Sequence, residues 1–179
     1  MEISLFNVQP GAPLPDRIKL LSWGRNDSIQ GLIIVGHVTA ARLAIEQKSR
    51  GFGEVALDFE HNTVPGSPEY ERSQEPRRVA AYGTPTVRAG EGLFLENMRW
   101  TPAGVEAARL YRDLSPSVAL DDQREVTFVH SAALVRNGAV HGLHLTLNSA
   151  ALPPRRGLDA VRAWSLKCVA DVYRKDRRL

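Results

Sequence analysis

Short runs in which apolar and polar residues alternate constrain the fold of this chain more than any other feature. In EVALDFEH, residues 54–61, one face is apolar and ends in His61. A period of two is typical of a strand with one buried face. The run VTFVHSAALV at 126–135 predicts a second such strand, in which His130 shares the apolar row of Val126, Phe128, Ala132 and Leu134. Further strands are expected at 18–23, 32–35, 79–87, 92–100 and from Leu114 onward.

Capping residues and hydrophobic spacing predict three helices. Thr39 is the expected N-cap of a helix that ends before Gly51. Thr101 and Pro102 are expected to start a helix over 103–112, because threonine caps and proline suits the first turn. An amphipathic helix is expected over 158–173. These elements predict an α+β protein, mainly an antiparallel β-barrel or sheet flanked by helices. The helix over 103–112 offers the core Val105, Ala108, Leu110 and Tyr111.

The length and the charge distribution indicate one domain and an appendage. The chain has 179 residues, and Pro153-Pro154 interrupts the pattern of elements, so we expect a domain over 1–150 and a basic helical appendage over 151–179. Residues 154–179 hold eight Arg or Lys and three Asp, so their net charge is +5, whereas the net charge of the whole chain is +3. The main body therefore sums to −2, which argues against nucleic-acid binding by the domain.

Several classes of protein and site are excluded by composition. The single cysteine, Cys168, allows neither an internal disulfide framework nor a cysteine-rich zinc site. No apolar run reaches the ~18 residues of a membrane span, and the N-terminus lacks the pattern of a signal peptide. The glycines form neither of the common nucleotide-binding motifs. We expect an intracellular protein without a cofactor, a metal or a membrane partner, with His37, His141 and His144 in surface or structural roles.

His61 and Ser115 are the candidates for the base and the nucleophile of a serine hydrolase. A serine hydroxyl is a weak nucleophile and needs an adjacent base, which in turn needs a group that orients it. His61 ends a strand just before a polar loop over 62–77, and Ser115 opens a strand after a helix. Each also has a structural interpretation, His61 as a solvent-facing strand end and Ser115 as a turn or cap serine. Ser117 shares the strand face of Ser115 and is its competitor.

The sequence resembles the I protein of Mu-like phages and prophages over about residues 15 to 145. The segments VALDFEHNT, RVAAYGTPTVRAGEGLFLENMRWTPAGVEAARL, YRDLSPSVAL and EVTFVHSAALVRNGAV carry the resemblance in this order. The matching motifs are Asp58 with His61, Gly92-Leu93, Trp100-Thr101-Pro102, Tyr111-Arg112 with Leu114-Ser115-Pro116, and Ala132-Ala133-Leu134.

The resemblance implies a capsid-maturation serine protease with a β-barrel, similar to phage prohead proteases and herpesvirus assemblins. It implies His61 as the base and Ser115 as the nucleophile. The third catalytic residue does not carry over directly. On the strand that supplies it in related enzymes, His130 is the ionisable group and our candidate, with Ser131 next to it on the opposite face. A neutral imidazole supports a protonated base less than a carboxylate does, so a slow enzyme is expected.

The resemblance also implies partners and a location. Scaffold and capsid proteins are the expected substrates. The expected location is the assembling prohead in the host cytoplasm. Assembly of the protein into a homodimer or a higher oligomer is left open as a possibility. Two other functions remain as alternatives. One is a catalytically inactive scaffold or capsid-interacting protein that retains the protease fold. The other is binding of nucleic acid by the basic segment 154–179, which would be sensitive to salt.

Overall fold

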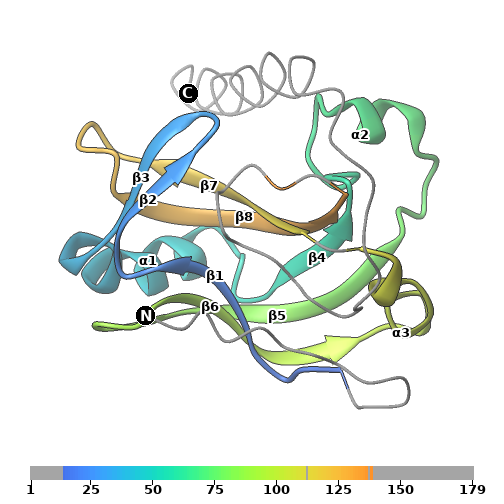
Figure 1. Ribbon diagram of the computed structural model, residues 1–179, viewed down its shortest axis with the longest axis horizontal. Helices are drawn as coiled ribbons and strands as arrows, with labels where there is room; N and C mark the ends of the chain where they lie inside the picture. The colour runs from blue at the N-terminus through green and yellow to red at the C-terminus, as the bar shows by residue number, and fades with distance from the viewer. Residues whose placement is uncertain (1–13, 112, 137, 139–179) are drawn as a thin grey trace.

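A nearly closed mixed β-sheet forms the body of the protein in this computed structural model, which describes residues 14–111, 113–136 and 138 (Figure 1). The strand order is β1-β6-β5-β4-β8-β7. All neighbours are antiparallel except β4 and β8, which are parallel. The end strands β1 and β7 lie close together, so the sheet approaches a barrel. The strands are β1 (Ile18–Ser22), β4 (Val55–Phe59), β5 (Val79–Arg88), β6 (Gly92–Trp100), β7 (Asp113–Leu120) and β8 (Val126–Val135).

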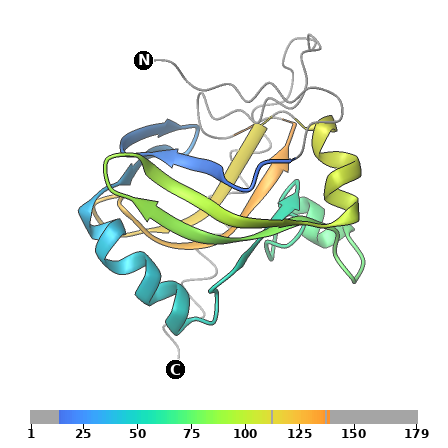
Figure 2. The same ribbon diagram turned by 90° about the horizontal axis from the view of Figure 1, so that it is seen from below.

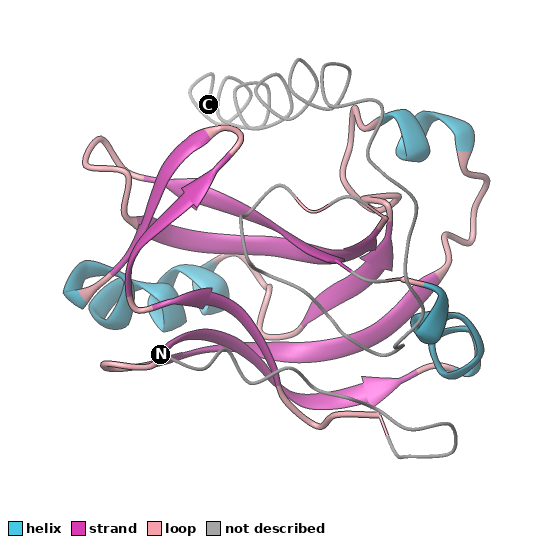
Figure 3. Ribbon diagram, in the orientation of Figure 1, coloured by secondary structure: helices cyan, strands magenta, loops and turns pink. Residues whose placement is uncertain are grey.

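The expected α+β architecture with a mainly antiparallel sheet is confirmed, and the predicted strands are present. One strand was not predicted: β2 (Gly24–Ser28) pairs with β3 (Gly31–Val35) in a separate hairpin. β3 contacts β8, and in the view of Figure 3 the hairpin crosses the left ends of β7 and β8. The sequence GRNDS of β2 is polar and lacks the apolar residues that indicate a buried strand.

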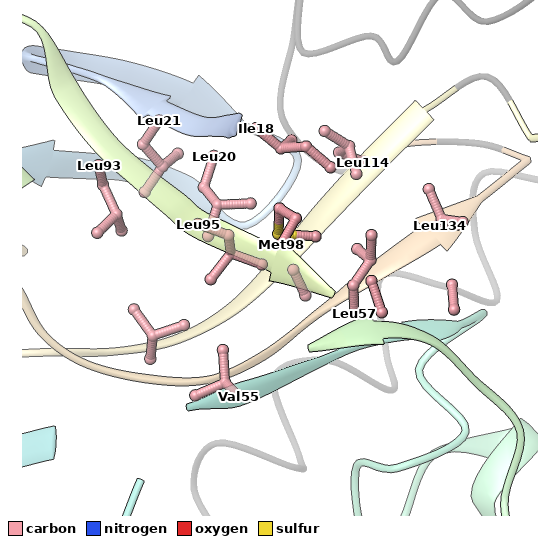
Figure 4. Close-up of a cluster of buried hydrophobic side chains, with 14 of the residues drawn as sticks. Ile18, Leu20, Leu21, Val55, Leu57, Leu93, Leu95, Met98, Leu114 and Leu134 are labelled. Atoms are coloured by element: carbon pink, nitrogen blue, oxygen red, sulfur yellow. The ribbon is translucent and has the colours of Figure 1, made fainter. Parts of the chain in front are cut away.

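Leucine side chains from most of the six strands fill the interior of the barrel (Figure 4). Leu57 of β4 and Leu134 of β8 are fully buried, as are Leu95 of β6 and Leu20 of β1. Burying a leucine side chain stabilises a fold by about 1.5–3 kcal/mol. This shared core ties β4, β8 and β7 to the opposite wall, and those three strands carry the candidate site.

The first helix begins earlier than its sequence predicts. The helix α1 covers His37–Ser49, and Gly36 rather than Thr39 is its N-cap. The carboxylate of Glu125, from the turn before β8, accepts hydrogen bonds from the amides of Val38 and Thr39 at 2.9 and 3.1 Å. A capping group that is distant in sequence cannot be found from local pattern. The predicted end is correct, because Gly51 follows the helix with φ of +76°.

The other two α-helices lie at the opposite end of the sheet from α1 (Figures 1 and 2). The short helix α2 (Pro68–Arg72) interrupts the loop predicted over 62–77. The helix α3 (Pro102–Ala107) starts as predicted, with the Thr101 hydroxyl accepting from the amide of Gly104 at 3.0 Å. It continues as a 3-10 turn, η1 (Ala108–Leu110). In the part of the chain described, no helix is long and apolar enough to span a membrane.

The apolar face expected for α3 and η1 is only partly buried. Ala108 is fully buried and Tyr111 packs against the core. Val105 and Leu110, however, are 56% and 78% exposed, so the expectation that they join the core is wrong. The helix is shorter than predicted and changes to a tighter winding after Ala107. This change rotates the later residues relative to a regular helix.

Candidate active site

Three neighbouring strands place Ser115 in one row with Asp58, three residues before His61. In the register of β4, β8 and β7, Asp58 pairs with Ala133, and Ala133 pairs with Ser115. Paired residues of adjacent strands project to the same face, so Asp58 and Ser115 share a face with an alanine methyl group between them. Two strand spacings separate their backbones by roughly 10 Å. Leu57 and Ala132 precede Asp58 and Ala133 and belong to the core, so this row faces away from the core.

We call this side of β4, β8 and β7 the polar face; it bears Asp58, Ser115, Ser117 and Ser131. Ser117 pairs directly with Ser131. Two of these polar side chains are nevertheless buried, since Ser131 is 1% and Ser115 is 6% exposed to solvent. Electrostatic interactions are stronger in such surroundings than in water.

A β-bulge directs His130 onto the polar face. One extra residue of β8, His130, is left between the pairs that β7 makes with Val129 and Ser131. Bulges often re-aim a side chain. The Nδ1 atom of His130 lies 3.1 Å from Oγ of Ser131, and the imidazole packs 5.5 Å from the ring of Phe52. The expectation that His130 continues the apolar row of its strand, opposite Ser131, is therefore wrong.

The strand that precedes His61 ends earlier than its alternating pattern suggests. β4 stops at Phe59, and Glu60 and His61 have φ angles of 53° and 62°. Positive φ is uncommon for residues other than glycine, although histidine adopts it more readily than most. The chain therefore turns sharply, and the alternation of faces ends with it. A regular strand would point the side chain of Asp58 away from the face of His61, and the turn removes that constraint.

The Asp58 side chain holds this turn. One carboxylate oxygen accepts from the amide of His61 at 3.0 Å, and the other accepts from the amide of Thr63 at 3.1 Å and from its hydroxyl. Asp58 is fully buried. Burial raises the pKa of its carboxyl from 3.8 to about 6, and the hydrogen bonds from Thr63 and His61 oppose that rise. Asp58 is therefore ionised at neutral pH.

The carbonyl group of His61 is held as firmly as its amide. It accepts from the amide of Val64 at 3.0 Å and from the hydroxyl of Ser67 at 2.7 Å. Ser67 is fully buried, and its hydroxyl oxygen also accepts from the amide of Tyr70 as the N-cap of α2. The backbone of His61 is thus fixed between β4 on one side and α2 on the other.

Both candidate imidazoles are neutral at neutral pH. Burial, and second the nearby His130, lower the pKa of His61 from 6.5 to about 4. Burial also lowers the pKa of His130. The effect of His130 on the pKa of His61 means that the two rings lie close enough for a charge on His130 to disfavour a charge on His61. A neutral imidazole is the form that accepts a proton from a serine.

The other histidines lie apart or outside the description. His37 starts α1 and packs edge-on against Trp23, 5.4 Å away. His141, His144, Cys168 and the predicted appendage over 151–179 lie outside the described residues. Among residues 14–111, 113–136 and 138, no three His, Cys, Asp or Glu side chains are grouped to hold a metal ion.

Sequence reasoning missed the residues that support His61. The sequence pattern shows Asp58 only as part of a motif with His61, and it places Thr63 and Ser67 in a polar loop. One signal was available, because aspartate and serine favour hydrogen bonds from their side chains to nearby backbone in turns. The signal for the bulge at His130 was absent, since bulges depend on pairing with another strand.

A family model for the N-terminal domain of the Mu-like prophage I protein matches residues 18–146. No significant match to this chain was found among curated proteins or among solved structures. The matched range begins at β1 and extends past β8, so it takes in the whole barrel and every candidate site residue. The chain therefore belongs to the Mu-like prophage I protein family.

Proposed function

We propose that this protein is a serine endopeptidase that cleaves scaffold and capsid proteins during head maturation of a Mu-like phage or prophage. The row formed by Asp58, Ala133 and Ser115 carries the proposal, because it joins a nearly buried serine to the turn that bears His61. His130 reaches the same face through the bulge in β8. A buried serine and a histidine on one face, beside the turn that bears a second, neutral histidine, suit peptide hydrolysis.

In the proposed mechanism, the Ser115 hydroxyl attacks the carbonyl carbon of the scissile bond while His61 takes the hydroxyl proton. His61 then gives this proton to the departing amine, and a water molecule releases the acyl group by the reverse sequence. His130 supports the positive charge that forms transiently on His61. Because His130 is itself neutral, its support is weaker than that of a carboxylate, and turnover is slow.

The proposal includes a relationship between this barrel and those of prohead proteases and herpesvirus assemblins. It also includes scaffold and capsid proteins as partners and the assembling prohead in the host cytoplasm as the location. A slow enzyme suits this setting, where each particle needs one round of processing. The membership in the Mu-like prophage I protein family supports a role in the phage, while the chemistry rests on the site alone.

A fluorophosphonate probe tests the chemistry without knowledge of the substrate. The serine oxygen bonds to phosphorus, fluoride leaves, and the hydroxyl proton passes to His61. Wild type is expected to carry one label, located by mass spectrometry in the peptide that contains Ser115. Ser115→Ala is expected to carry none, and His61→Gln to react about 10²–10⁴ times more slowly.

Ser117→Ala is the matched control, because Ser117 lies on the same strand and face. It is expected to label as wild type does. Labelling of Ser117 instead would reassign the nucleophile, and a folded wild type with no label would refute the protease and favour an inactive scaffold or capsid-interacting protein. If Ser115 is the labelled residue, particles assembled with Ser115→Ala should retain uncleaved scaffold.

A further inference from the structure

We propose that Asp58 and Ser67 are positioning residues, an inference that rests on the proposed function. They hold the backbone turn at His61, and this turn aims the His61 imidazole along the polar face toward Ser115. Neither side chain needs to touch the substrate. Each acts through a hydrogen bond to the backbone of His61, one to its amide and one from a hydroxyl to its carbonyl.

The first step of the argument is strain. Glu60 and His61 are consecutive residues with positive φ, a backbone conformation that is unfavourable for residues other than glycine. Such a conformation persists only where surrounding groups hold it. Here the holding groups are the Asp58 carboxylate, with three donors, and the Ser67 hydroxyl. Both side chains are fully buried, so water does not compete for these hydrogen bonds.

The second step is the connection between His61 and the nucleophile. Asp58 pairs with Ala133, whose other partner is Ser115, so the carboxylate belongs to the same sheet row as the nucleophile. A hydrogen bond from the His61 amide to Asp58 therefore ties the base to that row. If the turn were released, the imidazole would move relative to Ser115 although both residues remained present.

The third step separates positioning from a charge effect. If the charge of Asp58 acted directly on the imidazole, its removal would lower the pKa of His61. If Asp58 holds the turn, its removal lets the ring reach water, and the pKa rises toward 6.5. The two roles therefore predict shifts of opposite sign. This difference makes the histidine titration a direct test.

The experiment follows the His61 ring signal by NMR titration in Ser115→Ala protein, so it needs no catalysis. Asp58→Asn and Ser67→Ala are expected to raise the midpoint for His61. In the presence of Ser115, each is expected to lower the maximal rate of fluorophosphonate labelling by about 100-fold, as a misplaced group does. The probe concentration at half-maximal rate should stay unchanged.

Matched controls exist for both variants. The Asp121 carboxylate accepts from the amides of Gln123 and Glu125, at 2.9 Å each, in the turn between β7 and β8. The Thr101 hydroxyl caps α3 and donates to the carbonyl of Val79 at 2.6 Å, as Ser67 caps α2 and donates to His61. Asp121→Asn and Thr101→Ala should lower stability without moving the His61 midpoint or the labelling rate.

A milder pair covers the case in which Asp58→Asn does not fold. Thr63→Val removes the hydroxyl that donates to Asp58, and Thr63→Ser keeps it. Thr63→Val is expected to change both readouts in the direction of Asp58→Asn, and Thr63→Ser to restore them. An unchanged or lowered midpoint, or labelling at the wild-type rate, would overturn the positioning role. A wild type that never labels would refute the protease, while the titration would still decide the role of Asp58.

Discussion

Asp58 and His61, three residues apart, have pKa shifts in opposite directions with one physical cause. Burial disfavours charge, which raises the pKa of the carboxyl to about 6 and lowers the pKa of the imidazole to about 4. Each shift corresponds to about 3 kcal/mol. Asp58 contributes stability that is present below pH 3.8 and is lost as pH rises through 6. His61 contributes stability that is present above pH 6.5 and is lost as pH falls through 4. The two effects largely cancel in the wild type.

Substitution of His61 should remove one of these two opposing contributions to the pH dependence of stability. In His61→Gln the acid-labile contribution is gone, so the variant should gain stability relative to wild type as pH falls from 6.5 to 4. The gain is expected to reach about 3 kcal/mol. Urea unfolding at several pH values measures it. A difference that stays constant with pH would show that His61 titrates in the folded protein as it does in the unfolded chain.

At the scale of elements, local signals located most of the secondary structure. Alternation identified the strands of the barrel, and Thr101 with Pro102 identified the start of α3, because these signals act within a few residues. Local signals failed where the decisive partner was distant. Glu125, which caps α1, lies 87 residues after Val38 in the sequence, and pairing with β7 determines the bulge at His130. Faces after a bulge cannot be assigned by counting residues.

The contact between α3 and β5 depends on a glycine. A Cβ atom on Gly104 would lie 1.9 Å from the carbonyl oxygen of Ala80, which is backbone and cannot move aside easily. Gly104→Ala is expected to destabilise the protein by about 1–3 kcal/mol. Gly53→Ala is the control, since nothing lies within 4 Å of its added Cβ atom. Equal unfolding midpoints in urea for the two variants would contradict this close packing.

At the scale of the whole molecule, the barrel interior makes the site a rigid one. The polar face and the core are opposite sides of the same strands, so the packing of Leu57 and Leu134 also fixes the row of Asp58 and Ser115. Some apolar residues lie outside this core. Val105 is exposed on α3, where it adds apolar surface outside the barrel.

Two truncations distinguish these environments. Leu57→Ala should cost about 2–5 kcal/mol, because it leaves a cavity among the core strands. Val105→Ala should change stability by less than about 0.5 kcal/mol, since its side chain is mostly in water. Chemical unfolding of both variants gives the comparison. A loss of several kcal/mol in Val105→Ala would mean that α3 is packed by a surface that the barrel does not provide.

The strand-rich class of the fold, the ends of most elements, and the candidates Ser115, His61 and His130 could all be identified from the sequence. These features depend on periodicity, on caps and on ordered motifs, all of which are local or linear. The faces of the strands on which these residues lie depend on the folded chain, because a bulge and two left-handed residues break the alternation that counting residues assumes. The tertiary structure also decided what holds His61, since the hydrogen bonds of Asp58 and Ser67 exist only once the chain has turned.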